Sequence, residues 1–373
     1  MGKLFPCALL FVLLMRGTLQ KKAVRGTTGQ RNGSAVPRSF IGIPVVQTKS
    51  VLNGTPSPIS THSLPALQSL SNATIEYLRG PLSTRVIPVL YLLMAAVGIP
   101  ANLAILSLLA GKIRKVSSAI LYCSLAVSDL LLLVSLFFKA HYHLSGNHWQ
   151  LGEAACRAVA ACFYGNLYCS ALTLACISVK RYLAVAHPFL YKSLPKRAAT
   201  VWASVGVWAL FGAAVTPELT VRQSYWLPEL NRTSCHDVLP LDRPSHAFLL
   251  YSNLALSVAG LLLPLLVAVA CFARIVCELN RSHYDWAAYV KASSLVFAIF
   301  VACFLPAAAL RFLHYARLVA GGNRGLYAHF NAAACLCCLH ACLDPFLFLL
   351  MSKSAGAKLF FMTFRGKTVS ISL

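Results

Sequence analysis

The stretch SAILYCSLAVSDLLLLVSLFF, residues 118–138, contains a single charged residue, Asp129. A helix of this length rises by about 30 Å, which is the thickness of the hydrocarbon core of a bilayer. No water is present there to bond unpaired peptide groups, so an apolar run of this length must satisfy its own backbone. The stretch is therefore predicted to be a membrane-spanning helix.

Six further apolar runs are long enough to cross a bilayer. Together with the first they cover residues 86–110, 118–138, 156–182, 198–217, 247–277, 289–315 and 326–350. Of the 373 residues, 58% are hydrophobic and only 12% are charged, about half of the charge that a soluble protein carries. The sequence predicts an all-α membrane protein, a seven-transmembrane helix bundle. It argues against a cytosolic enzyme, a disulfide-rich secreted scaffold and a disordered chain.

The formal charge of +23 comes from 33 Lys and Arg residues against ten Asp and Glu residues. In a chain this apolar, the excess is typical of membrane edges rather than of nucleic-acid binding. Cations gather at one set of helix ends, for example at Lys112, Lys115, Lys196 and Arg197, which predicts that this side faces the cytoplasm. We therefore expect a multi-pass plasma-membrane protein with an extracellular N-terminus, in contact with lipid and not with nucleic acid.

The segments outside the predicted bundle (residues 86–350) have their own composition. Residues 1–18 combine a basic start with a short apolar run, which is typical of a signal peptide. Residues 19–85 are rich in Ser, Thr, Pro, Asn and Gly, which predicts a flexible, disordered extracellular segment. Residues 351–373 are predicted to be a short cytoplasmic tail. Four glycosylation sequons lie on the outer side, at Asn32, Asn53, Asn72 and Asn231.

Ionisable residues inside membrane spans are costly and therefore indicate function. Asp129 lies in LAVSD and Asp344 in LDPFLF, and Asn102 lies in the first span. Seven spans with these residues resemble the rhodopsin-like G-protein-coupled receptors. The resemblance implies an allosteric sodium pocket of Asp129, Ser170 and Asp344, and no other metal or cofactor. A packing network of buried hydrogen bonds without an ion is the alternative.

The resemblance also implies a disulfide between Cys156 and Cys235, both on the oxidising side of the membrane. It implies that Arg181, at the end of the third span, couples to a heterotrimeric G protein. Three residues depart from the pattern of these receptors. Lys180 stands where an acid usually precedes the Arg and cannot pair with it, and Phe272 and Phe348 stand where Tyr is usual. These departures leave open whether the chain signals by itself.

Longer strings narrow the resemblance to the protease-activated receptors. They include CHDV from Cys235, FYGNLYCS from Phe163 and LDPF from Leu343. This family implies that an extracellular serine protease cuts the outer segment and that the new N-terminus binds to the receptor as a tethered ligand. Residues at the outer helix ends could hold this ligand. They are Tyr164, His236, Asp237, His314, Tyr315, Tyr327 and Phe330, with Glu153 as a further acid.

The string AVPRSFIG, residues 35–42, supplies a cleavage site between Arg38 and Ser39. Pro37 holds the residue before it extended, the shape that a protease cleft accepts. Cleavage turns the amide nitrogen of Ser39 into an amine that is mostly protonated at neutral pH. About 47 residues join Ser39 to the first span, and a flexible linker of that length reaches roughly 35–40 Å. The tethered ligand would comprise Ser39, Phe40, Ile41, Gly42, Ile43 and Pro44.

Two questions stay open. The string PRSF resembles a thrombin site, but residues 39–75 contain no Asp or Glu to dock on a basic exosite, so a thrombin- or trypsin-like serine protease is expected. The rival function is a cleavable co-receptor that presents a protease or the tethered peptide to another receptor, such as another protease-activated receptor, without coupling to a G protein.

An enzyme is not expected, because the sequence has no HExxH, GxSxG or phosphate-binding glycine motif. The run CLCCLHAC, residues 335–342, looks like a metal cluster. Because it lies within an apolar span, its cysteines are predicted to be small packing residues.

Overall fold

The computed structural model describes residues 40–41, 43–44, 65–68, 70, 72–111, 113, 116–240, 244–281, 287–320, 326–346 and 348. All of them belong to the second of two compact units, residues 35–373. Several predicted features lie outside the described residues. They are the signal peptide, Asn32, Asn53, the cleavage residues Arg38 and Ser39, Gly42 of the tethered ligand, and the cytoplasmic tail.

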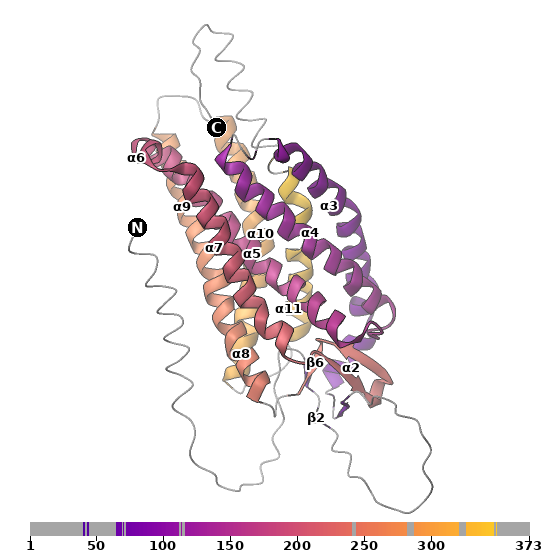
Figure 1. The fold of residues 1–373 in the computed structure, drawn as a ribbon. Helices are drawn as coiled ribbons and strands as arrows, with labels where there is room; N and C mark the ends of the chain where they lie inside the picture. The colour runs from indigo at the N-terminus through magenta and orange to yellow at the C-terminus, as the bar shows by residue number, and fades with distance from the viewer. Residues whose placement is uncertain are drawn as a thin grey trace, which may run out of the picture. The chain divides into compact units, whose positions relative to one another are not determined.

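Seven helices in the described part of the chain are long and apolar enough to cross a membrane, which confirms the predicted fold (Figure 1). The spans are Asn72–Ala110, Ser117–Leu144, Gly152–Ala186, Lys196–Thr220, Ala247–Asn280, Phe297–Val319 and Leu326–Phe346. The helices are α2 (Asn72–Arg79), α3 (Ile87–Ala110), α4 (Ser117–Leu144), α5 (Gly152–Ala186), α6 (Pro188–Ser193), α7 (Lys196–Thr220), α8 (Pro244–Leu256), α9 (Leu263–Asn280), α10 (Ala287–Val319) and α11 (Leu326–Cys337), with short turns η1 (Leu82–Val86), η2 (Pro228–Leu230) and η3 (Ser257–Leu262).

Helical structure begins earlier than the sequence predicts. The flexible segment was expected to reach residue 85, whereas α2 starts at Asn72 and leads through η1 into α3. The ring of Tyr77 meets that of Tyr327 edge-on, and its hydroxyl accepts a hydrogen bond from Asn331 at 2.9 Å. These tertiary contacts stabilise α2. A helix of about two turns is too short to leave a recognisable helical period of apolar residues in the sequence.

Apolar side chains cover both the inner and the outer faces of the helices. Leu132, Leu133 and Leu136 of α4 are fully buried, whereas Trp202 and Leu266 are 71% and 64% exposed. Exposed apolar surface of this kind is stable where it meets lipid. The spans are therefore apolar around their whole circumference, as expected of transmembrane helices.

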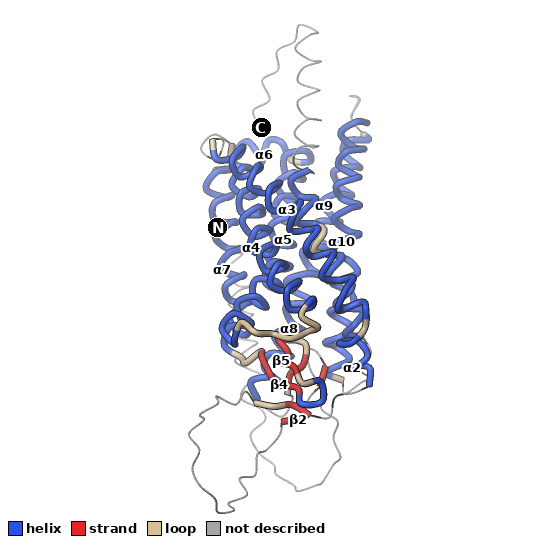
Figure 2. The backbone as a smooth tube through the Cα atoms, turned by 90° about the vertical axis from the view of Figure 1, so that its right-hand side faces the viewer, coloured by secondary structure: helices blue, strands red, loops and turns tan. Residues whose placement is uncertain are grey.

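The strands gather with α2 at one end of the helices, and α6 lies at the opposite end (Figures 1 and 2). Strands β4 (Ser224–Leu227) and β5 (Arg232–Cys235) form an antiparallel hairpin. Strand β6 (Val238–Leu239) pairs in parallel with β1 (Phe40–Ile41), and β2 (Ile43–Pro44) pairs with β3 (Leu67–Gln68) in antiparallel fashion. The segment predicted to be disordered thus contributes three short strands.

The fifth span is interrupted by η3, a turn of π-helix. Gly260 in this turn lies against Tyr168 of α5, where an added Cβ would be 2.7 Å from Cδ1 of the ring. Only glycine allows so close an approach without displacing the ring. The turn therefore lets the fifth span pack tightly against Tyr168, whose hydroxyl takes part in the site described next.

Candidate functional site

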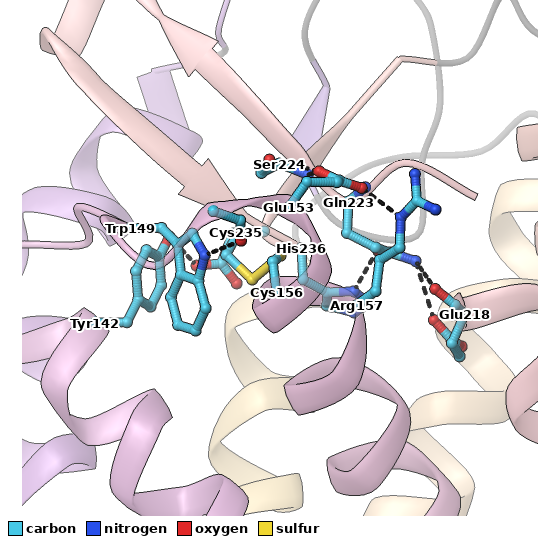
Figure 3. Close-up of a disulfide and its surroundings, with 12 residues drawn as sticks. Tyr142, Trp149, Glu153, Cys156, Arg157, Glu218, Gln223, Ser224, Cys235 and His236 are labelled. Atoms are coloured by element: carbon cyan, nitrogen blue, oxygen red, sulfur yellow. Dashed lines mark hydrogen bonds and ion pairs between the residues drawn. A yellow bond between two sulfur atoms is a disulfide. The ribbon is translucent and has the colours of Figure 1, made fainter. Parts of the chain in front are cut away.

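The disulfide between Cys156 and Cys235 joins the start of α5 to the end of β5, as the resemblance implies (Figure 3). Glu153, one turn before Cys156, accepts hydrogen bonds from the backbone nitrogens of Gln223 and Ser224, both at 2.8 Å. It also pairs with Arg157 at 2.6 Å. Glu153, which the sequence offered as an acid for the ligand, instead fixes the β4–β5 hairpin on α5.

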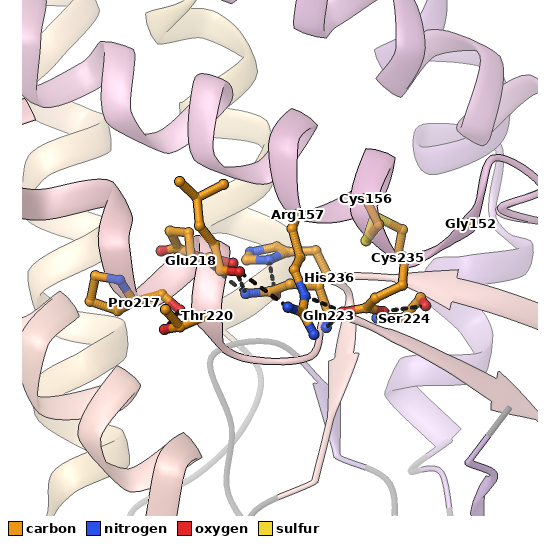
Figure 4. Close-up of polar contacts among 12 residues, drawn as sticks. Gly152, Cys156, Arg157, Pro217, Glu218, Thr220, Gln223, Ser224, Cys235 and His236 are labelled. Atoms are coloured by element: carbon orange, nitrogen blue, oxygen red, sulfur yellow. Dashed lines mark hydrogen bonds and ion pairs between the residues drawn. A yellow bond between two sulfur atoms is a disulfide. The ribbon is translucent and has the colours of Figure 1, made fainter. Parts of the chain in front are cut away.

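Gln223 positions the turn that follows the hairpin (Figure 4). Its carbonyl accepts from the backbone nitrogen of His236 at 2.8 Å, and its side-chain oxygen lies 2.9 Å from Nδ1 of the same residue. His236 has a φ of 72°, which is uncommon outside glycine. The ring of His236 rests 4.6 Å from the ring of Tyr164. This turn directs the next residue, Asp237, towards the helices.

Asp237 is a buried carboxylate held by two tyrosines. Tyr142 donates to Oδ2 at 2.8 Å, and Tyr327 donates to Oδ1 at 2.7 Å. Within the described part of the chain no Lys, Arg or His lies at ion-pair distance from it. A buried charge with only neutral hydroxyl partners has lost most of its hydration and favours a cation beside it.

The other predicted ligand residues surround this acid with aromatic rings. The ring of Phe330 stacks on His314 at 5.9 Å and on Tyr164 at 6.3 Å. His314 also lies 5.9 Å from Tyr327 and 5.3 Å from Tyr315. The structure thus brings all seven predicted residues into one buried cluster at the strand end of the helices.

Arg311 is a member of this cluster that the sequence analysis did not select. It is fully buried, with its guanidinium 4.8 Å from the ring centre of Tyr164 and 5.5 Å from that of Phe330. Its Nη2 donates to the hydroxyl of Tyr168 at 2.5 Å and to Oδ1 of Asn253 at 2.6 Å. The signal in the sequence that could have identified Arg311 is its charge within an otherwise apolar span.

A second polar cluster lies in the middle of the spans. Ser170 donates to Oδ1 of Asp129 at 3.3 Å, so two of the three predicted sodium ligands are in contact. Asp129, Asp344 and His340 each offer one ligand atom, and these atoms lie within 4.8 Å of one another. Cys335 and Cys338, in the same run as His340, are buried in the hydrophobic core. His340 differs from these cysteines because it contacts the carboxylate of Asp129.

At the opposite end of the helices, Arg181 donates through Nη2 to the hydroxyl of Tyr122. Lys180 instead donates to Ser117 at 2.8 Å and to Thr200 at 3.1 Å. The sequence predicts that the usual ionic restraint on Arg181 is missing; the hydroxyl of Tyr122 is one of the contacts that Arg181 makes in the structure. A cavity of about 70 Å³ lies beside it, and its lining includes Arg181, Phe272, Phe348 and Asp344.

Two of the predicted glycosylation sites fall on described residues. Asn72 is exposed at the start of α2, and Asn231 is exposed at the end of η2. The threonines of the two sequons, Thr74 and Thr233, are buried. Glycosylation at both sites stays a prediction.

Residues 101–348 match the family model of the 7 transmembrane receptor (rhodopsin family). The chain is 42% identical to Proteinase-activated receptor 3 of Homo sapiens over 79% of each chain. It is 40% identical to Proteinase-activated receptor 3 of Bos taurus over 91% of this chain and 88% of the relative. It is 34% identical to Proteinase-activated receptor 4 of Homo sapiens over 82% of this chain and 80% of the relative.

The seven spans and the matched residues define a receptor of the rhodopsin family, a multi-pass protein of the plasma membrane. Within that class, the chain belongs to the proteinase-activated receptors. These are receptors rather than enzymes.

Proposed function

We propose that this receptor is activated when a thrombin- or trypsin-like serine protease cuts after Arg38, and that the new N-terminus from Ser39 acts as its tethered ligand. The pairing of β1 with β6 supports this proposal most directly. Phe40, which follows Ser39, pairs in parallel with Val238, which follows Asp237. We infer from this register that the amine released at Ser39, one residue before Phe40, binds to Asp237, one residue before Val238.

The charge of the new amine is what distinguishes the cut chain from the uncut chain. Before cleavage the nitrogen of Ser39 is a neutral amide; afterwards it is mostly a cation at neutral pH. A cation beside Asp237 compensates a buried carboxylate whose partners among the described residues are the hydroxyls of Tyr142 and Tyr327. The free energy of this charge pair is available only to the cleaved receptor.

The fixed charges in the aromatic cluster also orient the ligand. Arg311 lies one turn of α10 before His314 and Tyr315 and is itself a cation among the same rings. It repels the amine and favours the carbonyl oxygens of the ligand. The amine therefore binds at Asp237, with the remainder of the peptide held by backbone pairing to β6 and β3.

The signal passes to a heterotrimeric G protein through Arg181. A synthetic amidated peptide, Ser-Phe-Ile-Gly-Ile-Pro, is expected to raise second-messenger levels in cells that express the full chain, because it supplies the same cationic end without cleavage. A trypsin-like protease should give the same response, with the cut after Arg38 identified by mass spectrometry.

The co-receptor alternative rests on the cytoplasmic end. Phe272 and Phe348 have no hydroxyl where these receptors usually have Tyr. Phe272 stacks on Phe297 at 4.2 Å, and Phe348 packs on Tyr122 at 4.9 Å. A flat second-messenger response to both agents, despite confirmed cleavage at the cell surface, would favour the co-receptor. Co-expression with another protease-activated receptor should then restore the response.

Tyr122→Phe is expected to raise basal nucleotide exchange on the G protein without any ligand, because it removes the hydroxyl that holds Arg181. A hydrogen bond to a charged group contributes about 1.5–3 kcal/mol, enough to shift the resting equilibrium roughly tenfold or more. Basal exchange in purified membranes measures the effect. Tyr182→Phe is the matched control, because its hydroxyl contacts His187. Equal basal rates in both variants would contradict this role for Tyr122.

A further inference from the structure

The cluster of Asp129, His340 and Asp344 has a donor set that differs from the predicted sodium pocket. Nε2 of His340 lies 3.5 Å from Oδ1 of Asp129, and both side chains are buried. Among the described residues, Nε2 of His340, Oδ2 of Asp129 and Oδ2 of Asp344 have no hydrogen-bond partner. Each of the three side chains thus has a buried ligand atom that makes no hydrogen bond, and the ligand atoms that they offer lie within 4.8 Å of one another.

A backbone carbonyl determines how the imidazole faces this point. Nδ1 of His340 lies 2.6 Å from the carbonyl oxygen of Cys337. Because a carbonyl oxygen only accepts, Nδ1 must carry the hydrogen. In the neutral ring, Nε2 is then the nitrogen with the free lone pair, and it lies 3.5 Å from Oδ1 of Asp129. A histidine ligand whose other nitrogen donates to a backbone carbonyl is the usual arrangement at protein metal sites.

Sodium does not fit this donor set. Na⁺ is a hard cation that takes oxygen ligands, whereas the site directs an imidazole nitrogen at its centre, and imidazole suits transition metals. One Na⁺ also balances only one of the two negative charges that Asp129 and Asp344 carry when both are ionised. A divalent ion would neutralise both, which removes the cost of an uncompensated charge in the spans.

We propose that Asp129, His340 and Asp344 bind a divalent transition-metal ion of the Zn²⁺ class rather than Na⁺. Two carboxylates and one imidazole are a common zinc donor set, with ligand distances of about 2.0–2.2 Å. The three ligand atoms lie within 4.8 Å of one another, so only small side-chain rotations would be needed to bring each of them to such a distance from one ion. The cavity of about 70 Å³ that reaches Asp344 beside Arg181 provides an approach for the ion.

Equilibrium dialysis against Zn²⁺ tests the proposal on the full chain in lipid nanodiscs, after removal of metal with a chelator. We expect one Zn²⁺ per receptor beyond any surface sites. His340→Asn keeps a polar side chain but removes the nitrogen donor, so its affinity at this site should fall at least tenfold. His141→Asn is the matched control, because His141 is exposed in the last turn of α4, the helix that contains Asp129. It should bind as the unmodified chain does.

A spectroscopic measurement on the unmodified chain guards against a variant that does not fold. Co²⁺ in place of Zn²⁺ should give visible absorption bands of a four- or five-coordinate site, and Zn²⁺ should displace them. The absence of these bands, or equal Zn²⁺ binding by the chain and by His340→Asn, would overturn the proposal. A proton shared between His340 and Asp129 would then explain their contact. Neither measurement uses a protease, a peptide or a G protein, so the outcome is independent of the proposed function.

Discussion

Arg38→Ala is expected to abolish the response to a trypsin-like protease and to leave the response to the amidated Ser-Phe-Ile-Gly-Ile-Pro peptide unchanged. The protease needs a basic side chain before the bond that it cuts, whereas the added peptide already carries the cationic end. Loss of an N-terminal epitope from the cell surface measures cleavage, and second-messenger release measures activation. With protease, the Arg38→Ala variant should show neither epitope loss nor second-messenger release above background. Its dose–response curve for the peptide should match that of the unmodified chain.

Arg31→Ala is the matched control for this experiment. Arg31 is another cation of the outer segment, but Asn32 and Gly33 follow it, whereas Ser39, Phe40 and Ile41 follow Arg38. This variant should be cleaved and activated as the unmodified chain is. Loss of both the protease and the peptide response in Arg38→Ala would contradict the tethered-ligand mechanism, because the peptide needs no cleavage.

Asp237→Asn is expected to raise the peptide concentration for half-maximal response by about 100-fold. Truncation of one member of a buried, hydrogen-bonded charge pair costs about 2–5 kcal/mol, and tenfold in affinity corresponds to about 1.4 kcal/mol. Asparagine keeps an oxygen that can accept from Tyr142 or Tyr327 but removes the negative charge. Dose–response curves at matched surface expression measure the shift.

A peptide with an acetylated N-terminus removes the other half of the pair. It should be weaker than the free peptide on the unmodified receptor and equally weak on Asp237→Asn, because the two changes delete one interaction. Glu229→Gln is the control, since Glu229 is an exposed acid of the same loop that accepts from the backbone nitrogen of Leu70. Additive losses from acetylation and Asp237→Asn would exclude a pair between the amine and Asp237.

The two polar clusters differ in how far the sequence could predict them. Tyr164, His236, Asp237 and the aromatic residues of α10 and α11 were found through resemblance to known receptors. Arg311 and His340 were not, because neither lies in the strings that carried that resemblance. What each does depends on its neighbours: the rings of Tyr164 and Phe330 around Arg311, and the carboxylate of Asp129 beside His340.

The sequence by itself determined the seven spans, because the cost of exposing peptide groups to lipid requires long apolar helices whatever their neighbours are. It also indicated the orientation, because cations remain on the cytoplasmic side of a membrane. Only the tertiary structure decided that α2 begins at Asn72, that Tyr122 holds Arg181 and that His340 faces Asp129. These contacts join residues far apart in the chain, and no local pattern specifies which side chains meet once the helices pack.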